Sequence, residues 1–438
     1  MTDLLAARWL FGLSLAFHIV FAAIGVAMPL LMVLAELRWR RTGSAVHLEL
    51  ARRWAKGTAI LFAVGAVSGT VISFELGLLW PRFMELAGPV IGMPFSLEGF
   101  AFFAEAIFLG VYLYGWDRVS PGVHLASGAA VAASGAASAF FVTLANAWMN
   151  SPAGFALAAG APVDVRPFAA MFPPGWAHEV IHVLLSSYVA TGFAVAGIHA
   201  ALLLRQPASA FHRAALGIAL AVAAAAALLQ PISGDFSARE VAETQPVKLA
   251  ALEGQFRTER GAPLRIGGLP DPARRETRFA LEVPRGLSLL AFHDPDAEVR
   301  GLEAFPEEIW PNVRNVHLAF QVMVGLGTLL AALSAASLLS LARGRAPPRA
   351  LLRAIALATP AGFVALEAGW LVTEWGRQPF TVRGVLTTAD SVTPVGGLLG
   401  PLVAFTLLYA FLGVVTAVLL RRQIARAPAG AAAAGEGA

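Results

Sequence analysis

The chain has 438 residues, of which 57% are hydrophobic and only 14% are charged. A soluble domain of this size needs a far more polar surface, so the composition indicates a polytopic membrane protein. The net charge is +4, but the basic residues lie in short stretches between apolar runs, where they orient membrane helices. Nucleic-acid binding is therefore not expected. Because the chain has no cysteine, disulfides, iron–sulfur clusters, thiolate ligands and haem attached through C-x-x-C-H are excluded.

Nine apolar runs are long enough to cross about 30 Å of hydrocarbon as helices. The first run has no basic segment before it and is too long for a signal-peptide core, so we expect it to be retained. Proline and glycine mark several of the joins between runs, as at residues 173–175. The predicted helices are 9–36, 55–80, 95–115, 124–149, 178–204, 212–232, 313–342, 350–373 and 397–420.

The distribution of basic residues orients this all-α bundle. With the N-terminus outside, sixteen Lys and Arg residues lie in the inner segments and five lie in the short outer segments. The positive-inside rule therefore predicts an outer N-terminus and a cytoplasmic C-terminus. The inner residues are Arg38, Arg40, Arg41, Arg52, Arg53, Lys56, Arg118, Arg205, Arg213, Arg343, Arg345, Arg349, Arg353, Arg421, Arg422 and Arg426, and the outer ones are Arg8, Arg82, Arg166, Arg377 and Arg383.

One outer segment is much longer than the others. Residues 233–312 are polar, charged and rich in proline and glycine, and a loop of about 80 residues between spans is usually functional. We therefore divide the chain into helices 1–6 (residues 1–232), an outer loop (233–312), helices 7–9 (313–421) and a cytoplasmic tail (422–438). The Ala/Gly composition of the tail predicts that it is disordered.

Three candidate metal ligands, His18, His182 and Met323, lie inside apolar runs. An imidazole or a thioether in hydrocarbon has a purpose when it binds a soft cation, and haem iron is the main candidate. His182 lies about four residues and Met323 about ten residues below the outer surface, a difference of about 9 Å along the helix axes. The two side chains can therefore face each other across a haem, and His/Met ligation gives low-spin, electron-transferring iron. The alternative is that Met323 fills space and His182 hydrogen-bonds at a helix end.

Further candidate site residues lie in the first and third predicted helices and at the end of the eighth. His18 has no charged residue within a turn, so it is a candidate for a second haem or for a proton relay. Glu98 and Glu105 are seven residues apart on one helix face, which indicates a proton path or a metal contact. Glu374 ends the eighth helix, and Arg377 follows at the outer boundary. An arginine there can clamp haem propionates with two hydrogen bonds, or it can simply reach the membrane interface.

At these residues the chain resembles subunit I of the cytochrome bd quinol oxidases. The run EWGRQPF at 374–380 is similar to the family's G-R-Q-P-W signature. Segments similar to the family's first, third and fourth helices, its quinol-binding loop and its seventh helix occur in the same order, and the resemblance covers residues 7–420. They are ARW at 7–9, LEGF at 97–100 with GWDR at 115–118, LANAWMNSP at 144–152, QPVKLAALE at 245–253 and FQVMVG at 320–325.

The resemblance implies a terminal respiratory oxidase that takes electrons from quinol and reduces oxygen to water. His182 and Met323 would bind a low-spin haem b. His18 and Glu374 would bind two high-spin haems, a haem b and a haem d, in an order that differs between family members. Arg377 would bind haem propionates. The sequence does not distinguish haem d from another haem b.

The resemblance also implies roles for four more residues. Lys248 and Glu253 would bind and deprotonate quinol at the outer face. Glu98 would lie against the di-haem site, and Glu105, with Ser138, would lie on the route of protons from the cytoplasm. Because quinol would release its protons outside and oxygen would take protons from inside, the reaction would generate proton motive force without a pump.

The implied location is the bacterial cytoplasmic (inner) membrane. The implied partners are a second large membrane subunit, in some members a small single-span subunit, ubiquinol or menaquinol, O2 and the lipid bilayer. The quinol loop lacks the insertion of long-loop members, so the chain resembles the short-loop, cyanide-insensitive-oxidase-like subgroup.

Other positions depart from the family pattern or offer alternatives. Gln321 stands where the family commonly has arginine, which removes a positive charge near the low-spin haem and predicts a lower potential. Phe380 replaces the tryptophan of the signature, which predicts a packing change. His178, one turn before His182, is an alternative ligand, and His317 is expected at the interface or near a propionate. His199 is a further histidine with no assigned role.

Two other classes of function remain open. A divergent relative would keep the bundle and the low-spin haem but hold only haem b or pass its electrons to another acceptor. A haem-free, proton-coupled transporter using Glu98 and Glu105 would show repeated halves or broken helices, and the sequence shows neither. A reduced-minus-oxidised spectrum of the purified complex separates these classes.

Overall fold

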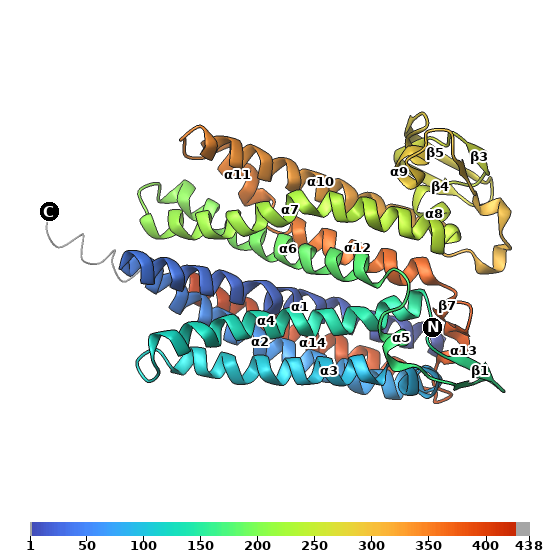
Figure 1. The fold of residues 1–438 in the computed structure, drawn as a ribbon, viewed down its shortest axis with the longest axis horizontal. Helices are drawn as coiled ribbons and strands as arrows, with labels where there is room; N and C mark the ends of the chain where they lie inside the picture. Colours follow the sequence, from blue (N-terminus) through green and yellow to red (C-terminus); the bar gives the residue numbers. More distant parts are fainter. Residues whose placement is uncertain (1, 426–438) are drawn as a thin grey trace, which may run out of the picture.

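The computed structural model describes residues 2–425 and shows a bundle of long helices with a small domain at one end (Figure 1). Within the described residues, nine helical segments are long and apolar enough to cross a membrane. This result confirms the predicted all-α, nine-span fold class. The segments are α1 (Asp3–Thr42), α2 (Ala45–Leu79), α3 (Pro81–Tyr114), α4 (Pro121–Asn150), α6 (Trp176–Arg205), α7 (Ala210–Thr244), α10 (Val313–Ala342), α11 with α12 (Arg349–Leu357 and Ala361–Arg377) and α14 (Leu399–Ala425).

Short elements connect the long helices. The segment between α4 and α6 holds a hairpin of β1 (Ala156–Ala158) and β2 (Ala161–Val163), followed by α5 (Pro167–Met171). The segment between α12 and α14 holds β7 (Phe380–Val382), β8 (Leu386–Thr387) and α13 (Thr388–Ser391).

Residues 246–309 form what we call the loop domain. In this domain β4 pairs with β5 and β3 pairs with β6, both antiparallel. Its elements are α8 (Pro246–Glu253), β3 (Glu259–Arg260), β4 (Leu264–Asp271), β5 (Glu276–Val283), α9 (Gly286–Phe292), β6 (Glu298–Val299) and the 3-10 turns η1 (Leu302–Ala304) and η2 (Glu307–Ile309).

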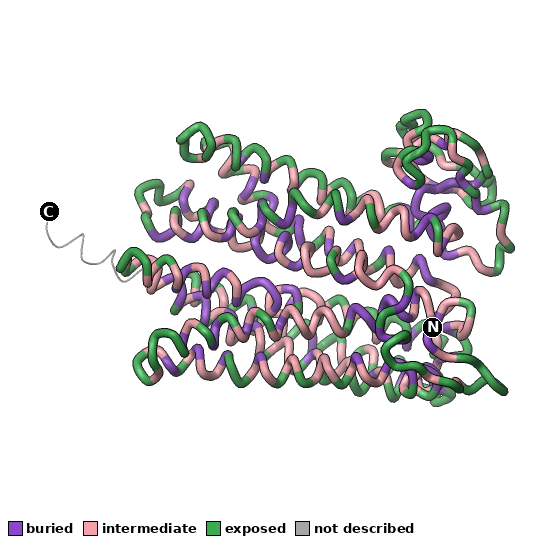
Figure 2. Tube along the Cα trace, in the orientation of Figure 1, coloured by how far each residue is buried: buried purple, intermediate pink, exposed green. Residues whose placement is uncertain are grey.

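Small residues let the helices approach closely. A Cβ on Gly192 of α6 would lie 2.7 Å from Cβ of Ala223 on α7, and a Cβ on Gly362 of α12 would lie 2.5 Å from Cα of Ala190 on α6. In a membrane, where lipid is as apolar as leucine, such close backbone contact is a main source of helix association. Figure 2 shows the buried residues gathered where the helices face one another.

Several helices are longer than the sequence prediction: α1 spans Asp3–Thr42, α2 begins at Ala45 and α3 begins at Pro81. Helix α7 continues past residue 232 to Thr244, and a pair of Arg239 with Asp235 at 3.1 Å, one turn apart, supports this extension. The predicted eighth helix is broken into α11 and α12 at Pro360, which cannot donate a backbone hydrogen bond.

The described part of the chain begins and ends at opposite ends of the bundle (Figure 1). The N-terminal end of α1 and the loop domain share one end, and α14 runs toward the other (Figure 1). Arg422–Ala425 of the predicted tail continue α14. Residues 426–438, for which the sequence predicts disorder, lie outside the described residues.

Candidate redox site

His18 on α1 is held by α2. Its Nδ1 lies 3.0 Å from the Ser68 hydroxyl, which in turn donates to the carbonyls of Val64 and Gly65 at 3.0 and 3.1 Å. Because the Ser68 proton is used there, its oxygen accepts a hydrogen bond from Nδ1–H of His18, which leaves the Nε2 lone pair free for a metal. A Cβ on Gly69 would lie 3.0 Å from the imidazole, so a small residue is needed beside it.

A buried carboxylate lies one turn further along the same pair of helices. Ser14 donates to Glu75 Oε1 at 2.8 Å, and the Tyr409 hydroxyl of α14 donates to Ser14 at 2.9 Å. Glu75 is only 4% exposed. Sequence reasoning missed Glu75, although an acid in the apolar run ISFELGLL was a visible signal.

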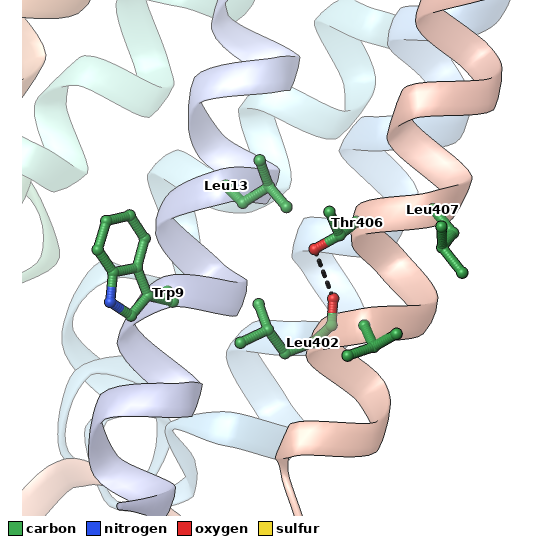
Figure 3. A pocket seen from close by; sticks show the side chains of 6 residues that line it. Trp9, Leu13, Leu402, Thr406 and Leu407 are labelled. Atoms are coloured by element: carbon green, nitrogen blue, oxygen red, sulfur yellow. Dashed lines mark hydrogen bonds between the residues drawn. The ribbon is translucent and has the colours of Figure 1, made fainter. Parts of the chain in front are cut away.

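Near this cluster, α1 and α14 border an apolar surface groove of about 530 Å³ (Figure 3). Trp9 and Leu13 line it from α1, and Leu402, Thr406 and Leu407 line it from α14. The Thr406 hydroxyl donates to the Leu402 carbonyl of its own helix, so its proton is not available to a ligand in the groove.

His182 and Met323 lie within a group of four helices, α6, α7, α10 and α12. Nδ1 of His182 lies 3.2 Å from the Ser233 hydroxyl of α7, and the His182 carbonyl accepts from Gln230 at 3.2 Å. Met323 lies on α10, where its sulfur is 3.1 Å from the position of a Cβ on Gly369 of α12. The two side chains therefore have separate neighbours, and their pairing across a haem stays a prediction.

Glu374 is the centre of a polar network that joins α12 to α4. Its Oε1 accepts from Asn146 Nδ2 at 2.7 Å, and its Oε2 accepts from Arg377 Nη2 at 2.6 Å. Asn150, one turn after Asn146, donates to Asn146 Oδ1 at 3.1 Å and accepts from Arg377 at 3.3 Å. The structure thus brings together the two predicted residues Glu374 and Arg377 and adds two asparagines.

The same network reaches a carboxylate that sequence reasoning missed. Asn150 donates to Glu179 Oε1 on α6 at 2.9 Å. Glu179 lies three residues before His182, so its position in an otherwise apolar run beside a candidate ligand was a usable signal.

Lys248 on α8 lies over α12. A Cβ on Gly376 would be 2.9 Å from Cε of Lys248, so the lysine side chain packs directly on this glycine. Burial lowers the pKa of Lys248 to about 8, and the Glu179 carboxylate opposes this shift. The lysine therefore adjoins the network of Glu374 and Arg377.

Glu253 ends α8 and is buried. Burial raises its pKa to about 8, and Arg265 of β4 opposes the rise. Within residues 2–425, its Oε2 has no hydrogen-bond partner. A buried acceptor without a partner is costly unless a donor such as a ligand hydroxyl reaches it.

The two predicted carboxylates of α3 face α4. Ser138 donates to Glu98 Oε1 at 3.0 Å, which brings these two predicted residues together. The Glu105 carboxylate lies in the seam of α1, α3 and α4, with its oxygens 3.4 to 3.5 Å from Cβ positions on Gly25 and Gly135. Glu98 and Glu105 therefore lie along one seam, as their spacing predicts.

The extra histidines have other neighbours. Nδ1 of His178 lies 3.0 Å from the Ser237 hydroxyl of α7. His199 and His212 face each other through their Nδ1 atoms at 3.0 Å. His317 is fully buried against the loop domain, where its two ring nitrogens face the Leu252 and Gly267 carbonyls. Its expected place at the interface or near a propionate stays a prediction.

The residues present fit haem. His18 and His182 each engage a serine through Nδ1, which leaves Nε2 for iron, and a thioether is a known axial partner of imidazole. Nε of Arg377 is buried and has no partner in the described part of the chain. A buried guanidinium nitrogen in this state fits an anionic group such as a propionate. An apolar helical bundle with such candidate ligands fits the class of membrane redox proteins.

Comparison with known proteins gives the family. Residues 6–428 match the cytochrome bd terminal oxidase subunit I family. The chain is 39% identical over 427 residues to a Bacillus subtilis protein named "Putative cytochrome bd menaquinol oxidase subunit I", with 96% of each chain covered. It is 31% identical to cytochrome bd ubiquinol oxidase subunit 1 of the same organism, covering 97% of this chain and 94% of the relative.

The fold agrees with a solved structure. The bd oxidase from Geobacillus thermodenitrificans matches with a TM-score of 0.92 and 40% identity, covering 97% of this chain and 99% of that chain. The chain belongs to the cytochrome bd terminal oxidase subunit I family. It is thus a quinol oxidase subunit, an oxidoreductase and a multi-pass membrane protein of bacterial type.

Proposed function

We propose that this subunit oxidises quinol at the outer membrane face and passes the electrons to an oxygen-reducing site within the bundle. The observation that carries this proposal is the contact of α8 with α12. Lys248, one of the two residues assigned to quinol, packs on Gly376, which lies between Glu374 and Arg377. The quinol segment and the proposed haem-binding strip are therefore adjacent, which favours direct electron transfer from bound quinol.

In this proposal the chain holds three haems. His182 and Met323 are the ligands of the low-spin haem b, and His18 and Glu374 are the ligands of a high-spin haem b and a haem d. The haems, when bound, supply one-electron transfer and the reduction of oxygen. Arg377 holds a propionate through its buried Nε, and Ser68 keeps His18 in the tautomer that leaves Nε2 free.

Protons take separate routes on the two sides. Glu253 accepts a proton from quinol, and Lys248 orients the quinol oxygen, both at the outer face. Glu105 and Glu98, with Ser138 donating to Glu98, deliver protons from the cytoplasm. The two routes separate charge across the membrane, so the reaction generates proton motive force without a pump.

The proposed assembly includes a second large membrane subunit and, as in some relatives, a small single-span subunit. The loop domain is compact and lacks a long insertion, which supports the short-loop, cyanide-insensitive-oxidase-like subgroup. We also propose the four-part division at residues 232, 312 and 421, with the end of α7 and the loop domain both belonging to the quinol-binding part.

Difference spectra of the purified complex test the haem assignment. Reduced-minus-oxidised spectra with pyridine haemochrome analysis should show b-type haem and a red-shifted chlorin band. Met323→Leu should lose the low-spin signal, because leucine offers no lone pair to iron. Met149→Leu, on α4, is the matched control and should keep it. A haem-free wild-type complex would contradict the proposal.

Quinol kinetics test the loop assignment. Lys248→Ala and Glu253→Ala should slow quinol oxidation by about 10²-fold or more, as loss of a general base does, with all haem spectra intact. Lys56→Ala and Glu276→Ala change exposed residues and are the controls. If the two α8 variants lose haem instead, their assignment to quinol is wrong.

A further inference from the structure

Two side chains of α10 hold the loop domain. His317 is fully buried, and both of its ring nitrogens lie at hydrogen-bond distance from backbone carbonyls of the loop domain. Nδ1 is 2.7 Å from the Leu252 carbonyl of α8, and Nε2 is 3.0 Å from the Gly267 carbonyl of β4. We call His317 and Gln321, one turn further along α10, the α10 clamp.

The two carbonyls determine which hydrogen bonds the His317 imidazole can make. A carbonyl oxygen only accepts hydrogen bonds, and a neutral imidazole has a single N–H. The ring therefore donates through its N–H to one of the two carbonyls and packs its other nitrogen against the second, so that it lies between α8 and β4. The Leu252 carbonyl is in the last turn of α8, where helix carbonyls lack partners within the helix.

Gln321 completes the contact with β4. Its Oε1 accepts from Gly267 N–H at 2.9 Å, and its Nε2 donates to the Arg265 carbonyl at 3.0 Å. Gly267 is thus held at its N–H by Gln321 and at its carbonyl by His317. Gly267 and Gly268 both have positive φ, +69° and +101°, a conformation that glycine adopts without strain.

The clamp acts on the segment assigned to quinol. Leu252, held by His317, directly precedes Glu253, and α8 packs with Val316 and Ala319 of α10 in one buried cluster. Met323 follows Gln321 by two residues on the same helix. The Gln321 amide is used by the loop domain, which gives a physical role to a position where the family commonly has arginine.

We propose that His317 and Gln321 are positioning residues of the quinol site, which hold α8 and β4 on α10 and so fix Glu253 relative to the helix that carries Met323. This inference rests on the proposed function of α8. Neither residue touches quinol in this scheme. Their contribution is to keep Glu253 and Lys248 in place, so quinol affinity should depend on them more than the electron-transfer step does.

The test uses the intact purified complex with its haems. His317→Phe keeps a ring of similar size and removes the ring N–H donor, whereas His317→Gln keeps an amide donor. Loss of one net hydrogen bond corresponds to about a tenfold change in a local opening equilibrium. His317→Phe should therefore raise hydrogen exchange of α8 and β4 amides about tenfold and raise the quinol KM by a similar factor, with kcat and haem spectra little changed.

Three variants make the result decisive. His317→Gln should recover part of the lost protection and part of the KM, and His293→Gln, an exposed histidine of the loop domain, should resemble wild type. Gln321→Leu removes contacts with β4 and should raise hydrogen exchange in β4 more than in α8. This variant tests the proposal if His317→Phe does not assemble into the complex.

Several results would overturn the inference. They are unchanged exchange in α8 and β4, faster exchange with an unchanged quinol KM, or loss of the low-spin haem in His317→Phe. Lys248→Ala and Glu253→Ala are measured alongside. If those variants also leave quinol kinetics unchanged, the proposed function of α8 fails, whereas the exchange data still report whether the clamp holds the domain.

Discussion

At the scale of single residues, serine hydroxyls orient the rings of the candidate histidine ligands and leave Nε2 available to a metal. Ser68 contacts His18 and Ser233 contacts His182, each through Nδ1. Such a second contact orients the ring and raises its basicity toward a metal. The serines come from α2 and α7, far from the histidines in sequence, so spacing along one helix did not predict them.

The pKa values of Lys248 and Glu253 predict an optimum for quinol oxidation near pH 8. Burial raises the pKa of Glu253 to about 8 and lowers that of Lys248 to about 8. Glu253 accepts a proton only when ionised, so kcat/KM should rise as the pH approaches 8 from below. Lys248 loses its charge above about pH 8, so kcat/KM should fall again. Because the two pKa values are similar, the rising and falling limbs of the pH profile overlap. The apparent pKa values read from the profile therefore belong to Lys248 and Glu253 together and not to either residue alone.

Measuring kcat/KM for quinol against pH checks this expectation. Glu253→Gln should lose the rising limb together with most of the activity. Lys248→Arg should lose the falling limb, because guanidinium stays charged throughout this range. Glu276→Gln, on the exposed face of β5, should keep the wild-type profile. If the rising limb of kcat/KM against pH persists in Glu253→Gln, that limb reports the titration of another group and the prediction is wrong.

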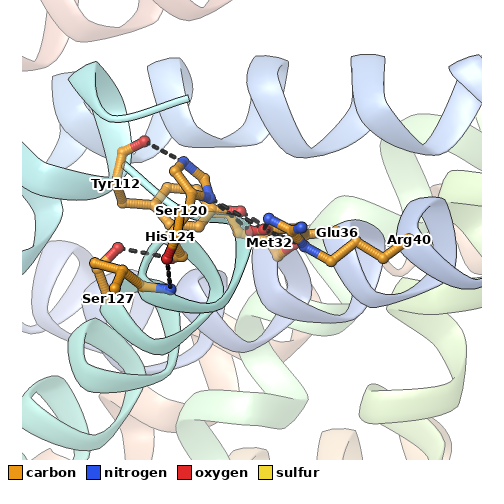
Figure 4. Close-up of polar contacts among 8 residues, drawn as sticks. Met32, Glu36, Arg40, Tyr112, Ser120, His124 and Ser127 are labelled. Carbon is orange, nitrogen blue, oxygen red and sulfur yellow. Dashed lines mark hydrogen bonds and ion pairs between the residues drawn. The ribbon is translucent and has the colours of Figure 1, made fainter. Parts of the chain in front are cut away.

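At the scale of elements, the ends of α1, α3 and α4 far from the loop domain are joined by a buried charged cluster (Figure 4). Glu36 of α1 is 0% exposed and accepts from Arg40 Nε at 2.8 Å and from His124 Nδ1 at 3.0 Å. Nε2 of His124 lies 3.0 Å from the Tyr112 carbonyl. Glu36 therefore faces the Arg40 guanidinium on one side and the His124 imidazole on the other.

Removing this anion should destabilise the bundle. Glu36→Gln removes the counter-charge of Arg40 and the carboxylate that faces His124, and a buried polar group left unsatisfied typically costs about 1–3 kcal/mol. Glu49→Gln is the matched control, because Glu49 pairs with Arg53 at the same spacing but is 23% exposed, whereas Glu36 is 0% exposed. Its loss should be below about 1 kcal/mol. Thermal inactivation of the purified complex measures both, and equal shifts would show that the buried cluster contributes little.

The nine spans could be predicted because each needs only length and apolar composition, which the sequence displays directly. The heptad spacing of Glu98 and Glu105 likewise placed both on one seam. The site as a whole could not be predicted in this way. Asn150, Glu179 and Glu374 come from three helices. Close packing such as that of Gly362 of α12 on Ala190 of α6 brings these helices together, and composition alone does not reveal it.

At the scale of the whole molecule, the bundle has a charge asymmetry that orients it in the membrane. The N-terminal end of α1 lies with the loop domain, and the turn between α10 and α11 lies at the opposite end (Figure 1). That turn carries Arg343 and Arg345, and Arg349 begins α11 directly after it. Arginine-rich turns remain on the cytoplasmic side during insertion, so the loop domain should face outward, where the proposed quinol protons are released.

The absence of cysteine makes this orientation directly measurable, because every thiol in a variant is an introduced one. Ala158→Cys in β1 and Ala346→Cys in the α10–α11 turn both replace exposed alanines, at opposite ends of the bundle. In intact cells a membrane-impermeant maleimide should label Ala158→Cys at once and Ala346→Cys only after the membrane is opened. The reverse pattern would place the loop domain in the cytoplasm, and quinol oxidation there would release its protons on the same side from which oxygen takes them.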